Sequence, residues 1–412
     1  MPRAIIPRPT PGIPSSQAGL VVLLGSMAAL GAVTGDIYLP SLPDIAADFS
    51  ASDGAAQATV SLTLLGGAVG QLVMGPISDV VGRRTPVLAG LVLHVAASIG
   101  IVLTPSLGLL LALRFVQGVG NAAAAVVALA VIRDLFTGAR AARLISQLML
   151  VIGVGPMLAP TVGSLIAHAA GWRGVFVLLA ACGAGLAVFV YVKLPDTLRP
   201  DDRGTRSVGA LVRGYRVLFG DARFIFLALL PGLGSSALMA WVVASPFLIM
   251  GTYALPDAVF PVVFAAGGVF MVGGAQLNAA LVRRVGPRRL LAAVLPLTLV
   301  CALALTLLSA SHTGGLAGLL IPMFAVLLAS GMGPANASAL AMSRHGEVAG
   351  SAAALIGTLQ AGTAAGMTAL VGTVGGGQLG MATVIAGALA LAMLIALTGA
   401  GVYRRQDPRQ LP

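Results

Sequence analysis

Twelve long apolar segments constrain the fold of this chain more than any other feature. Each is about 20 residues or longer, enough for an α-helix to cross the roughly 30 Å hydrocarbon core of a membrane. The predicted spans are 17–46, 54–78, 86–104, 107–132, 144–168, 174–193, 224–251, 257–280, 290–309, 315–342, 349–375 and 379–402. The sequence lacks the ten-residue segments of alternating apolar and polar residues that would predict a β-barrel. The sequence therefore predicts an all-α polytopic membrane protein.

Composition and charge agree with this class. Hydrophobic residues make up 58% of the 412 residues and charged residues 9%, whereas a soluble domain carries about 25% charged residues. The net charge of +11 lies almost entirely between the spans, on one side of the membrane when both termini are cytoplasmic. The basic segments lack the interleaved aromatic residues that stack bases. The charge thus predicts orientation, with no nucleic-acid partner.

The longest polar stretch, residues 194–223, divides the predicted spans six and six. It predicts a cytoplasmic linker, with a surface helix over 209–219, between an N-terminal six-helix bundle (17–193) and a C-terminal one (224–402). Residues 1–16 and 403–412 are predicted cytoplasmic tails. A Gln-Leu pair followed by an Arg-Arg pair recurs at the same spacing in both halves, at 71–84 and 276–289. Such an echo is typical of transporters built from two pseudo-symmetric bundles.

Asp36 and Arg114 are ionisable residues inside these apolar spans. A charge near the centre of a membrane helix costs about 2.5–3.5 kcal/mol on insertion scales, so it is retained mainly for a function. Burial and a nearby guanidinium act in opposite directions on the protonation of a carboxylate, and the pair is therefore a candidate proton switch. The alternatives are a structural carboxylate at a helix end for Asp36 and an arginine that reaches the outer interface for Arg114.

A further motif ends the second span and begins the third. It contains Gly75, Asp79, Gly82, Arg83 and Arg84. Gly75 permits close helix approach, Gly82 permits a turn, and the paired arginines can reach carboxylates or helix ends. We expect these charge contacts to latch the two bundles together on the cytoplasmic side. The alternative is a positively charged anchor with a turn.

This motif resembles the loop signature of the major facilitator superfamily. Two other segments extend the resemblance. Residues 114–120 (RFVQGVG) are similar to the fourth-helix motif, whose arginine is implicated in proton coupling. Residues 153–163 are similar to the fifth-helix motif of drug:proton antiporters, with Gly155, Pro156, Pro160 and Gly163 as its conformational residues. This chain departs from the loop signature at Val80, where many members carry a basic residue.

Residues 36–45 (DIYLPSLPDI) narrow the resemblance to the bicyclomycin and chloramphenicol resistance exporters, the Bcr/CflA group. The similarity continues through Gln57, 70–71, 171–173, 277–278 and 349–352. It implies twelve transmembrane helices in two six-helix bundles, export of small hydrophobic drugs by alternating access, and a monomer in the bacterial inner membrane. It also implies that the proton gradient drives transport and that no cofactor is needed. Some relatives outside this group carry a second acid where this chain has Ala28, so Asp36 is expected to carry the proton alone.

Substrate contacts follow less directly from the sequence. The candidates are polar or aromatic residues within the spans: Tyr38, Gln57, Gln117, Asn121, Trp241, Asn336 and Gln360. Each could equally serve helix packing. An exporter of an endogenous metabolite or amphiphile on the same scaffold is the alternative function. An enzyme is not expected, because the chain offers no cluster of reactive side chains, and Cys182 and Cys301 lie apart in different spans, without a metal site.

Overall fold

The computed structural model describes residues 17–136, 138–198, 208–345, 349–375 and 377–404, and every regular element within them is helical. The first half begins with α1 (Gln17–Asp36), followed by the short helices η1 (Leu39–Ser41) and α2 (Leu42–Asp48). It continues with α3 (Asp53–Val81), α4 (Arg84–Val102), α5 (Leu107–Leu135) and α6 (Gly138–Lys193). The predicted surface helix in the linker is α7 (Val208–Gly220). Residues 1–16 and 405–412 of the predicted tails, and residues 199–207 of the linker, lie outside the described part.

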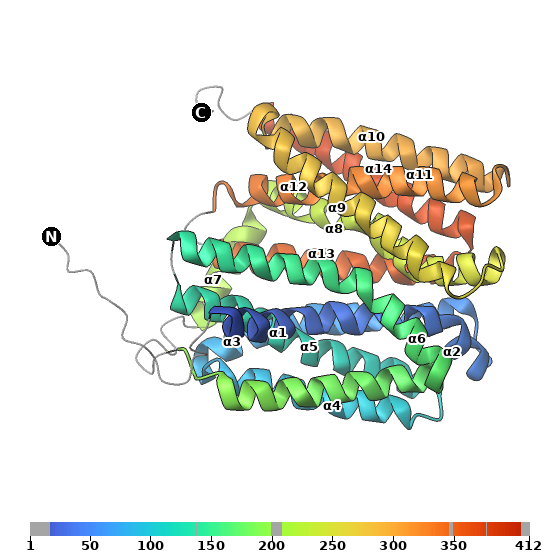
Figure 1. Cartoon of the computed structure of the whole chain (residues 1–412). Helices are drawn as coiled ribbons and strands as arrows, with labels where there is room; N and C mark the ends of the chain where they lie inside the picture. Colours follow the sequence, from blue (N-terminus) through green and yellow to red (C-terminus); the bar gives the residue numbers. More distant parts are fainter. Residues whose placement is uncertain (1–16, 137, 199–207, 346–348, 376, 405–412) are drawn as a thin grey trace.

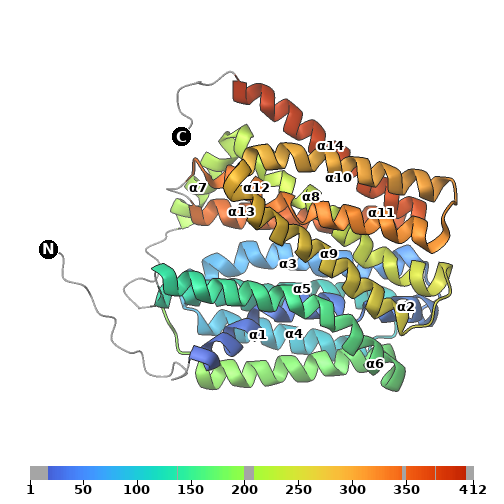
Figure 2. The ribbon, with the colours of Figure 1, turned by 45° about the horizontal axis from the view of Figure 1, so that its top comes forward.

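The second half consists of α8 (Ala222–Pro246), the π-helical turn η3 (Phe247–Thr252), α9 (Val259–Val285), α10 (Pro287–Ala310), α11 (Gly315–Ser330), α12 (Gly333–Met342), α13 (Ala349–Thr373) and α14 (Gln378–Arg404). Figure 1 shows α8–α14 above α1–α6, with the axes of the long helices roughly aligned and α7 at one end. The same grouping is visible after rotation in Figure 2.

Eleven segments of the described chain are long and apolar enough to span a membrane. One of them, Arg143–Lys193, has 51 residues, about twice the length that one span needs. Gly171 interrupts α6 with φ 69° and ψ 176°, a backbone conformation that no helix contains. Two spans therefore meet at Gly171, and the twelve predicted transmembrane helices are confirmed.

The first predicted span, 17–46, agrees with the membrane-length segment Gly19–Asp48, but it is not one continuous helix, because α1 ends at Asp36. Pro40 has no N–H to bond to the carbonyl of residue 36, and its ring would clash with that carbonyl. The chain turns at Ile37 and Tyr38 before it continues as η1 and α2. Asp36 thus lies at the carboxyl end of α1, beside irregular backbone, rather than inside a continuous helix.

The two halves contact each other mainly along α3 and α13, and along α6 and α9. A buried hydrogen bond joins Ser61 Oγ of α3 to Thr368 Oγ1 of α13 at 2.6 Å. Thr368 donates its hydroxyl proton to the carbonyl oxygen of Ala365 at 2.8 Å, so Ser61 is the donor between the halves. Near one end of this contact, a methyl group on Gly372 would lie 3.0 Å from the carbonyl oxygen of Gly54.

The largest buried apolar cluster joins the halves at the end where α2 lies, opposite α7 in Figure 1. It brings Tyr38 and Leu42 of the first half together with Trp241 and Phe260 of the second. A second cluster lies wholly within the first half and three smaller ones within the second half or its junction with α7. Among the described residues, the halves therefore share an apolar core at the end away from α7.

Candidate functional site

Arg114 lies on α5, which packs against α1, α3 and α4 in the middle of the first half. Two glycines that follow it allow this packing. A methyl group on Gly118 would stand 2.9 Å from the backbone nitrogen of Gly67 in α3, and one on Gly120 would stand 3.0 Å from the backbone nitrogen of His94 in α4. Larger residues would push the helices apart. The glycines of the Arg114–Gly120 motif thus bring three helices around the arginine.

The Arg114 side chain is completely buried, which contradicts the alternative in which it reaches the outer interface. Its Nη1 donates to Oε1 of Gln117 at 2.5 Å and to the carbonyl oxygen of Thr34 in α1 at 3.4 Å. Its Cζ lies 4.1 Å from the centroid of the Tyr38 ring and 5.6 Å from that of Phe176, within the range of cation–π attraction. Nε and Nη2 make no hydrogen bond to the described residues. The cation is held by an amide, a carbonyl and two aromatic faces.

Tyr38 is fixed by the second spanning helix. Its hydroxyl lies 2.8 Å from Thr59 Oγ1 of α3. Thr59 donates its one hydroxyl proton to the carbonyl oxygen of Ala56 at 2.6 Å, so Tyr38 must donate to Thr59. The Tyr38 ring also packs on Phe176, with centroids 5.6 Å apart. Its face is therefore presented to Arg114 in one orientation.

Asp36 is half-buried at the carboxyl end of α1, two residues before Tyr38. Within the described chain, neither Asp36 nor Arg114 takes part in an ion pair. The two residues thus share the neighbourhood of the break in the first spanning helix, where Thr34 and Tyr38 both contact the guanidinium. Arg114 therefore contacts the residues on both sides of Asp36, Thr34 in α1 and Tyr38 after it, without pairing with the Asp36 carboxylate.

The fifth spanning helix, the first part of α6, packs directly on this break. A methyl group on Gly163 would stand 2.7 Å from the carbonyl carbon of Ile37 and would overlap its oxygen. Gly155 lies two turns earlier, in ordinary contact with Val33 of α1. Pro156 and Pro160 lie within the helix between them. Gly163 is thus the residue of this motif that sets how closely α6 approaches Asp36 and Tyr38.

The remaining candidate substrate contacts fall into two groups. Gln57 and Asn121 are buried, and their amide groups have no hydrogen-bond partner among the described residues. Asn121 faces Gly31 of α1, one turn along α5 from Gln117. Both residues are in the first half, as are Arg114 and Tyr38. Two unsatisfied buried amides call for an explanation, such as an absent water or substrate.

The candidates of the second half lie elsewhere. Trp241 packs edge-on against Phe324, with centroids 6.4 Å apart, inside the second half. Asn336 donates to Asn278 Oδ1 at 2.6 Å, and Gln360 donates to Ser235 Oγ at 3.1 Å. These side chains contact helices of their own bundle. Among the described residues none of them bonds to Arg114, although Trp241 shares the apolar core with Tyr38.

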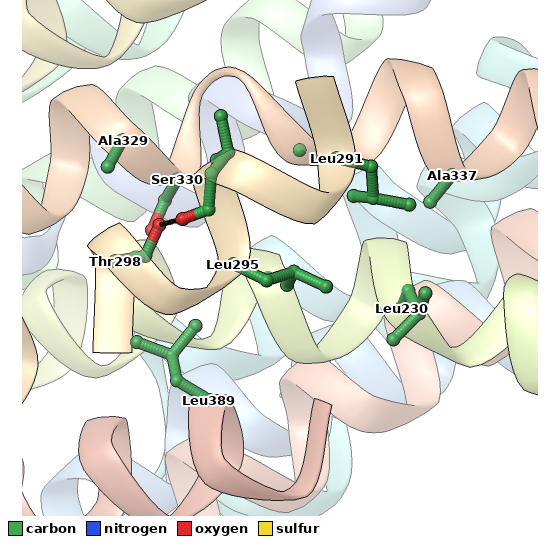
Figure 3. Close-up of a pocket in the computed structure, with 11 residues that line it drawn as sticks. Leu230, Leu291, Leu295, Thr298, Ala329, Ser330, Ala337 and Leu389 are labelled. Carbon is green, nitrogen blue, oxygen red and sulfur yellow. Dashed lines mark hydrogen bonds between the residues drawn. The ribbon is translucent and has the colours of Figure 1, made fainter. Parts of the chain in front are cut away.

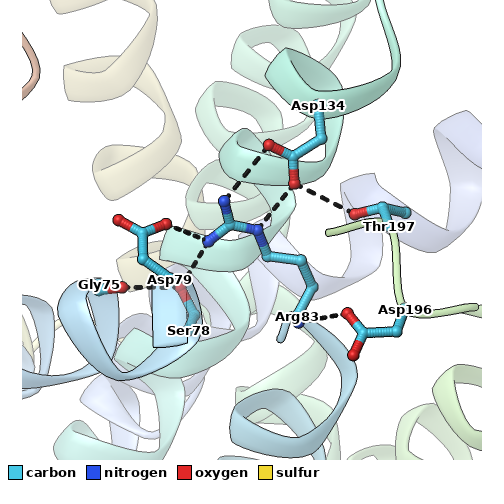
Figure 4. A network of polar contacts seen from close by, with 7 residues as sticks. All are labelled: Gly75, Ser78, Asp79, Arg83, Asp134, Asp196 and Thr197. Atoms are coloured by element: carbon cyan, nitrogen blue, oxygen red, sulfur yellow. Dashed lines mark hydrogen bonds and ion pairs between the residues drawn. The ribbon is translucent and has the colours of Figure 1, made fainter. Parts of the chain in front are cut away.

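Arg83, between the end of α3 and the start of α4, is the centre of a separate polar network (Figure 4). Its Nε and Nη2 donate to Asp134 of α5 at 2.8 and 3.3 Å, and its Nη1 donates to Asp79 at 2.6 Å and to Ser78 at 2.8 Å. Burial lowers the pKa of Arg83, but its hydrogen bonds and charge contacts with Asp134 and Asp79 outweigh this effect and raise the pKa above its ordinary value. The backbone N–H of Arg83 donates to Asp196 Oδ1 at 2.8 Å. Arg83 thus joins α3, α5 and the segment after α6.

Within the described chain, the hydrogen bonds given for Arg83 lie in the first half and brace that bundle, while the expected latch between the bundles stays a prediction. Gly82 has φ 102°, and a methyl group on it would overlap the Asp196 carboxylate. Both its backbone conformation and its close neighbour therefore favour glycine. Arg84 leaves the network and lies over the ring of Tyr191, 4.7 Å from its centroid. Gly75 makes ordinary contact rather than a close approach.

Sequence reasoning missed several members of both sites. Asp134 and Asp196 each follow a span on the side expected to be cytoplasmic, and an acidic residue at a helix end beside basic loops was a usable signal. Thr34, Thr59, Ser98 and Phe176 carry no such signal, because small polar and aromatic residues are common in transmembrane helices.

A pocket in the second half is lined by α8, α10, α11, α12 and α14 (Figure 3). Thr298 and Ser330 are the polar residues of an otherwise apolar lining, and the pocket has room for about one water molecule. The described residues contain no group of metal-ligating side chains. This pocket is too small for a drug-sized ligand.

Known proteins resemble this chain over most of its length. A family model described as Major Facilitator Superfamily matches residues 22–369. "Uncharacterized MFS-type transporter YdgK" of Bacillus subtilis is 33% identical over 345 residues, which are 83% of this chain and 86% of that protein. "Bicyclomycin resistance protein homolog" of Haemophilus influenzae is 29% identical over 345 residues, covering 82% and 85%.

Among solved structures, the partially occluded inward-open xylose transporter XylE from E. coli matches with a TM-score of 0.70. It covers 92% of this chain and 97% of that one at 15% identity, which shows a common fold. The similarity to bicyclomycin resistance proteins and the two-bundle architecture expected from the sequence are confirmed. The chain belongs to the major facilitator superfamily, and it is a multi-pass membrane transporter rather than an enzyme.

Proposed function

We propose that this transporter is a proton-coupled exporter of small hydrophobic drugs such as chloramphenicol or bicyclomycin. One observation carries the proposal: Arg114 is a fully buried cation that forms no ion pair with a carboxylate of the described chain, next to the helix break that bears Asp36. A buried charge is costly unless it is used, and the nearby acid is the natural group to exchange a proton. Similarity to a bicyclomycin resistance protein homolog supports drugs as the substrates.

In the proposed cycle, Asp36 binds a proton from the outside and releases it to the cytoplasm. When Asp36 is ionised, its carboxylate moves toward the free Nε and Nη2 of Arg114, and the charges compensate each other. When Asp36 is protonated, Arg114 remains on the ring of Tyr38, as in the present arrangement. Drug binding favours the form without the proton, so the two ligands exchange. A single carboxylate moves about one proton per cycle.

The drug would enter between the two halves. The unsatisfied amides of Gln57 and Asn121 supply hydrogen-bonding groups in otherwise apolar surroundings, the composition that a site for small hydrophobic drugs requires. Both lie in the half that carries Asp36 and Arg114. A drug that contacts them is therefore sensitive to the protonation of the site.

Alternating access follows from the asymmetry of the core. With the α7 end and both termini in the cytoplasm, as the basic loops favour, the apolar core shared by the halves closes the outer end. Rocking of one bundle against the other then moves the opening between the two sides. We propose that a monomer in the bacterial inner membrane performs this cycle without a cofactor.

The test measures proton release from the purified full chain on addition of chloramphenicol or bicyclomycin. The native chain should release protons, and Asp36→Asn should release none while it still binds the drug. Asp44→Asn is the matched control, because Asp44 is an exposed acid on neighbouring α2. Unchanged release by Asp36→Asn would refute the coupling mechanism. Release with endogenous amphiphiles but with neither drug would refute the proposed substrate class.

A further inference from the structure

A line of hydrogen bonds runs from Arg114 away from Asp36 into the third spanning helix. Gln117 accepts from Arg114 Nη1 at 2.5 Å through Oε1 and donates through Nε2 to Ser98 Oγ of α4 at 2.8 Å. Ser98 in turn donates to the carbonyl oxygen of His94 at 2.7 Å. The side chains of Arg114, Gln117 and Ser98 are all completely buried. Water therefore cannot replace a lost partner easily.

The chemistry of these groups allows one orientation of the Gln117 amide. The single hydroxyl proton of Ser98 is used by His94, so Ser98 Oγ can only accept from Gln117. The amide must then direct its NH₂ toward Ser98 and its oxygen toward Arg114. If the amide turned over, its NH₂ would face a guanidinium that has no acceptor. Arg114 and Ser98 thus require the same orientation of Gln117, and their two hydrogen bonds hold its side chain between them.

We propose that Ser98 is a positioning residue for the proton-coupling site, acting on Arg114 through Gln117. The inference rests on the proposed function and extends the site to a third helix. Ser98 keeps the guanidinium on the Tyr38 face with Nε and Nη2 free to receive the ionised Asp36. The contact is possible because α4 and α5 approach closely at Gly90 and Gly120, where a methyl group on Gly90 would stand 2.6 Å from the carbonyl oxygen of Gly120.

Loss of the Ser98 hydroxyl leaves the Nε2 of Gln117 buried without an acceptor. A shift of the Gln117 side chain toward another acceptor for Nε2 then takes Oε1 away from Arg114 Nη1. We expect Ser98→Ala to slow chloramphenicol-induced proton release about tenfold, the effect of losing one hydrogen bond to a charged group. Ser98→Thr keeps a hydroxyl that can bond to the carbonyl four residues earlier, and it should restore release.

The experiment measures chloramphenicol-induced proton release by the native chain and four variants. The variants are Ser98→Ala, Ser98→Thr, Gln117→Ala and the double variant Ser98→Ala/Gln117→Ala. Because Ser98 acts through Gln117, the double variant should lose no more than Gln117→Ala alone. Thr298→Val is the control: Thr298 is a buried hydroxyl in α10, the third spanning helix of the other half, and donates to its own helix at Val294. Additive losses, or native release by Ser98→Ala, would overturn the proposal.

A structure of Ser98→Ala is a second measurement that does not depend on transport. The Arg114 Cζ should lie farther from the Tyr38 centroid than the present 4.1 Å, beyond the roughly 6 Å limit of cation–π contact. An unmoved guanidinium would refute the positioning role. If the native chain releases no protons, the proposed function fails, while this structure still decides whether Ser98 positions Arg114.

Discussion

Substitution of Gly163 by alanine tests how the fifth spanning helix supports the proposed proton-coupling site. The added methyl group would stand 2.7 Å from the carbonyl carbon of Ile37 and overlap the attached oxygen. Carbon atoms in contact are about 3.5–4.0 Å apart, so α6 and the end of α1 must separate by about 1 Å. Both groups belong to backbone, and no flexible side chain can move aside. The break at Asp36 and Tyr38 is therefore displaced.

Overpacking of this kind costs about 1–3 kcal/mol, against a gain of about 0.5–1 kcal/mol from replacing glycine in a helix. We expect Gly163→Ala to lower the free energy of unfolding by a net ~1–2 kcal/mol. The effect on coupling should be larger, because a misplacement of about 1 Å at a reacting site can cost about 100-fold in rate. Drug-induced proton release should therefore fall at least about tenfold.

Gly153→Ala provides the matched control in the same helix. Nothing lies within 4 Å of a methyl group at that position. Gly153→Ala should raise the thermal midpoint in detergent slightly and leave proton release unchanged, since only the helical propensity improves. The two variants are compared by thermal unfolding and by proton release with the same drug. Equal behaviour of Gly163→Ala and Gly153→Ala would refute the argument that Gly163 sets the position of α1.

Three other predictions concern the turn, the cavity and the contact between the halves. Gly82→Ala should destabilise the chain more than Gly286→Ala in thermal unfolding, because both have positive φ but only the former meets a carboxylate; equal losses would contradict this. Gln57→Leu should leave stability unchanged or higher, since its amide has no partner, but weaken drug binding about fivefold or more in equilibrium titrations; unchanged affinity would exclude Gln57 from the site. Ser61→Ala should remove the donor to Thr368 and shift the equilibrium between inward-open and outward-open states by about 0.5–1.5 kcal/mol. Cysteine accessibility measures this equilibrium, and an unshifted equilibrium would show that the bond forms in both states.

Much of the loop motif could be anticipated, but its role could not. Asp79, Gly82 and Arg83 are marked in the sequence by their types and their spacing at a helix end. Their partners Asp134 and Asp196 come from distant segments that the fold brings to Arg83. The sequence could not say which partners these charges meet, because charges at a helix end can reach in several directions. Packing of α3 against α5 brings Arg83 to Asp134.

The proposed coupling site shows the same division between what the sequence marks and what packing decides. The cost of charge in a membrane singled out Asp36 and Arg114, and the proline-rich stretch after Asp36 made a helix break foreseeable. Ser98 could not be recognised in the same way. A serine within an apolar span has no distinguishing neighbours, and its role depends on the rotation of α4 about its axis against α5.

The sequence by itself determined the class, the number of spans, the division into two halves and the two charged residues within them. These follow from hydropathy and the cost of burying charge, which act locally along the chain. The tertiary structure alone decided that Arg114 lies on the ring of Tyr38, bonded to Gln117 and apart from Asp36. Such contacts depend on helix rotation and on close approach at Gly118, Gly120 and Gly163. Packing between distant helices sets both, and no local pattern records them.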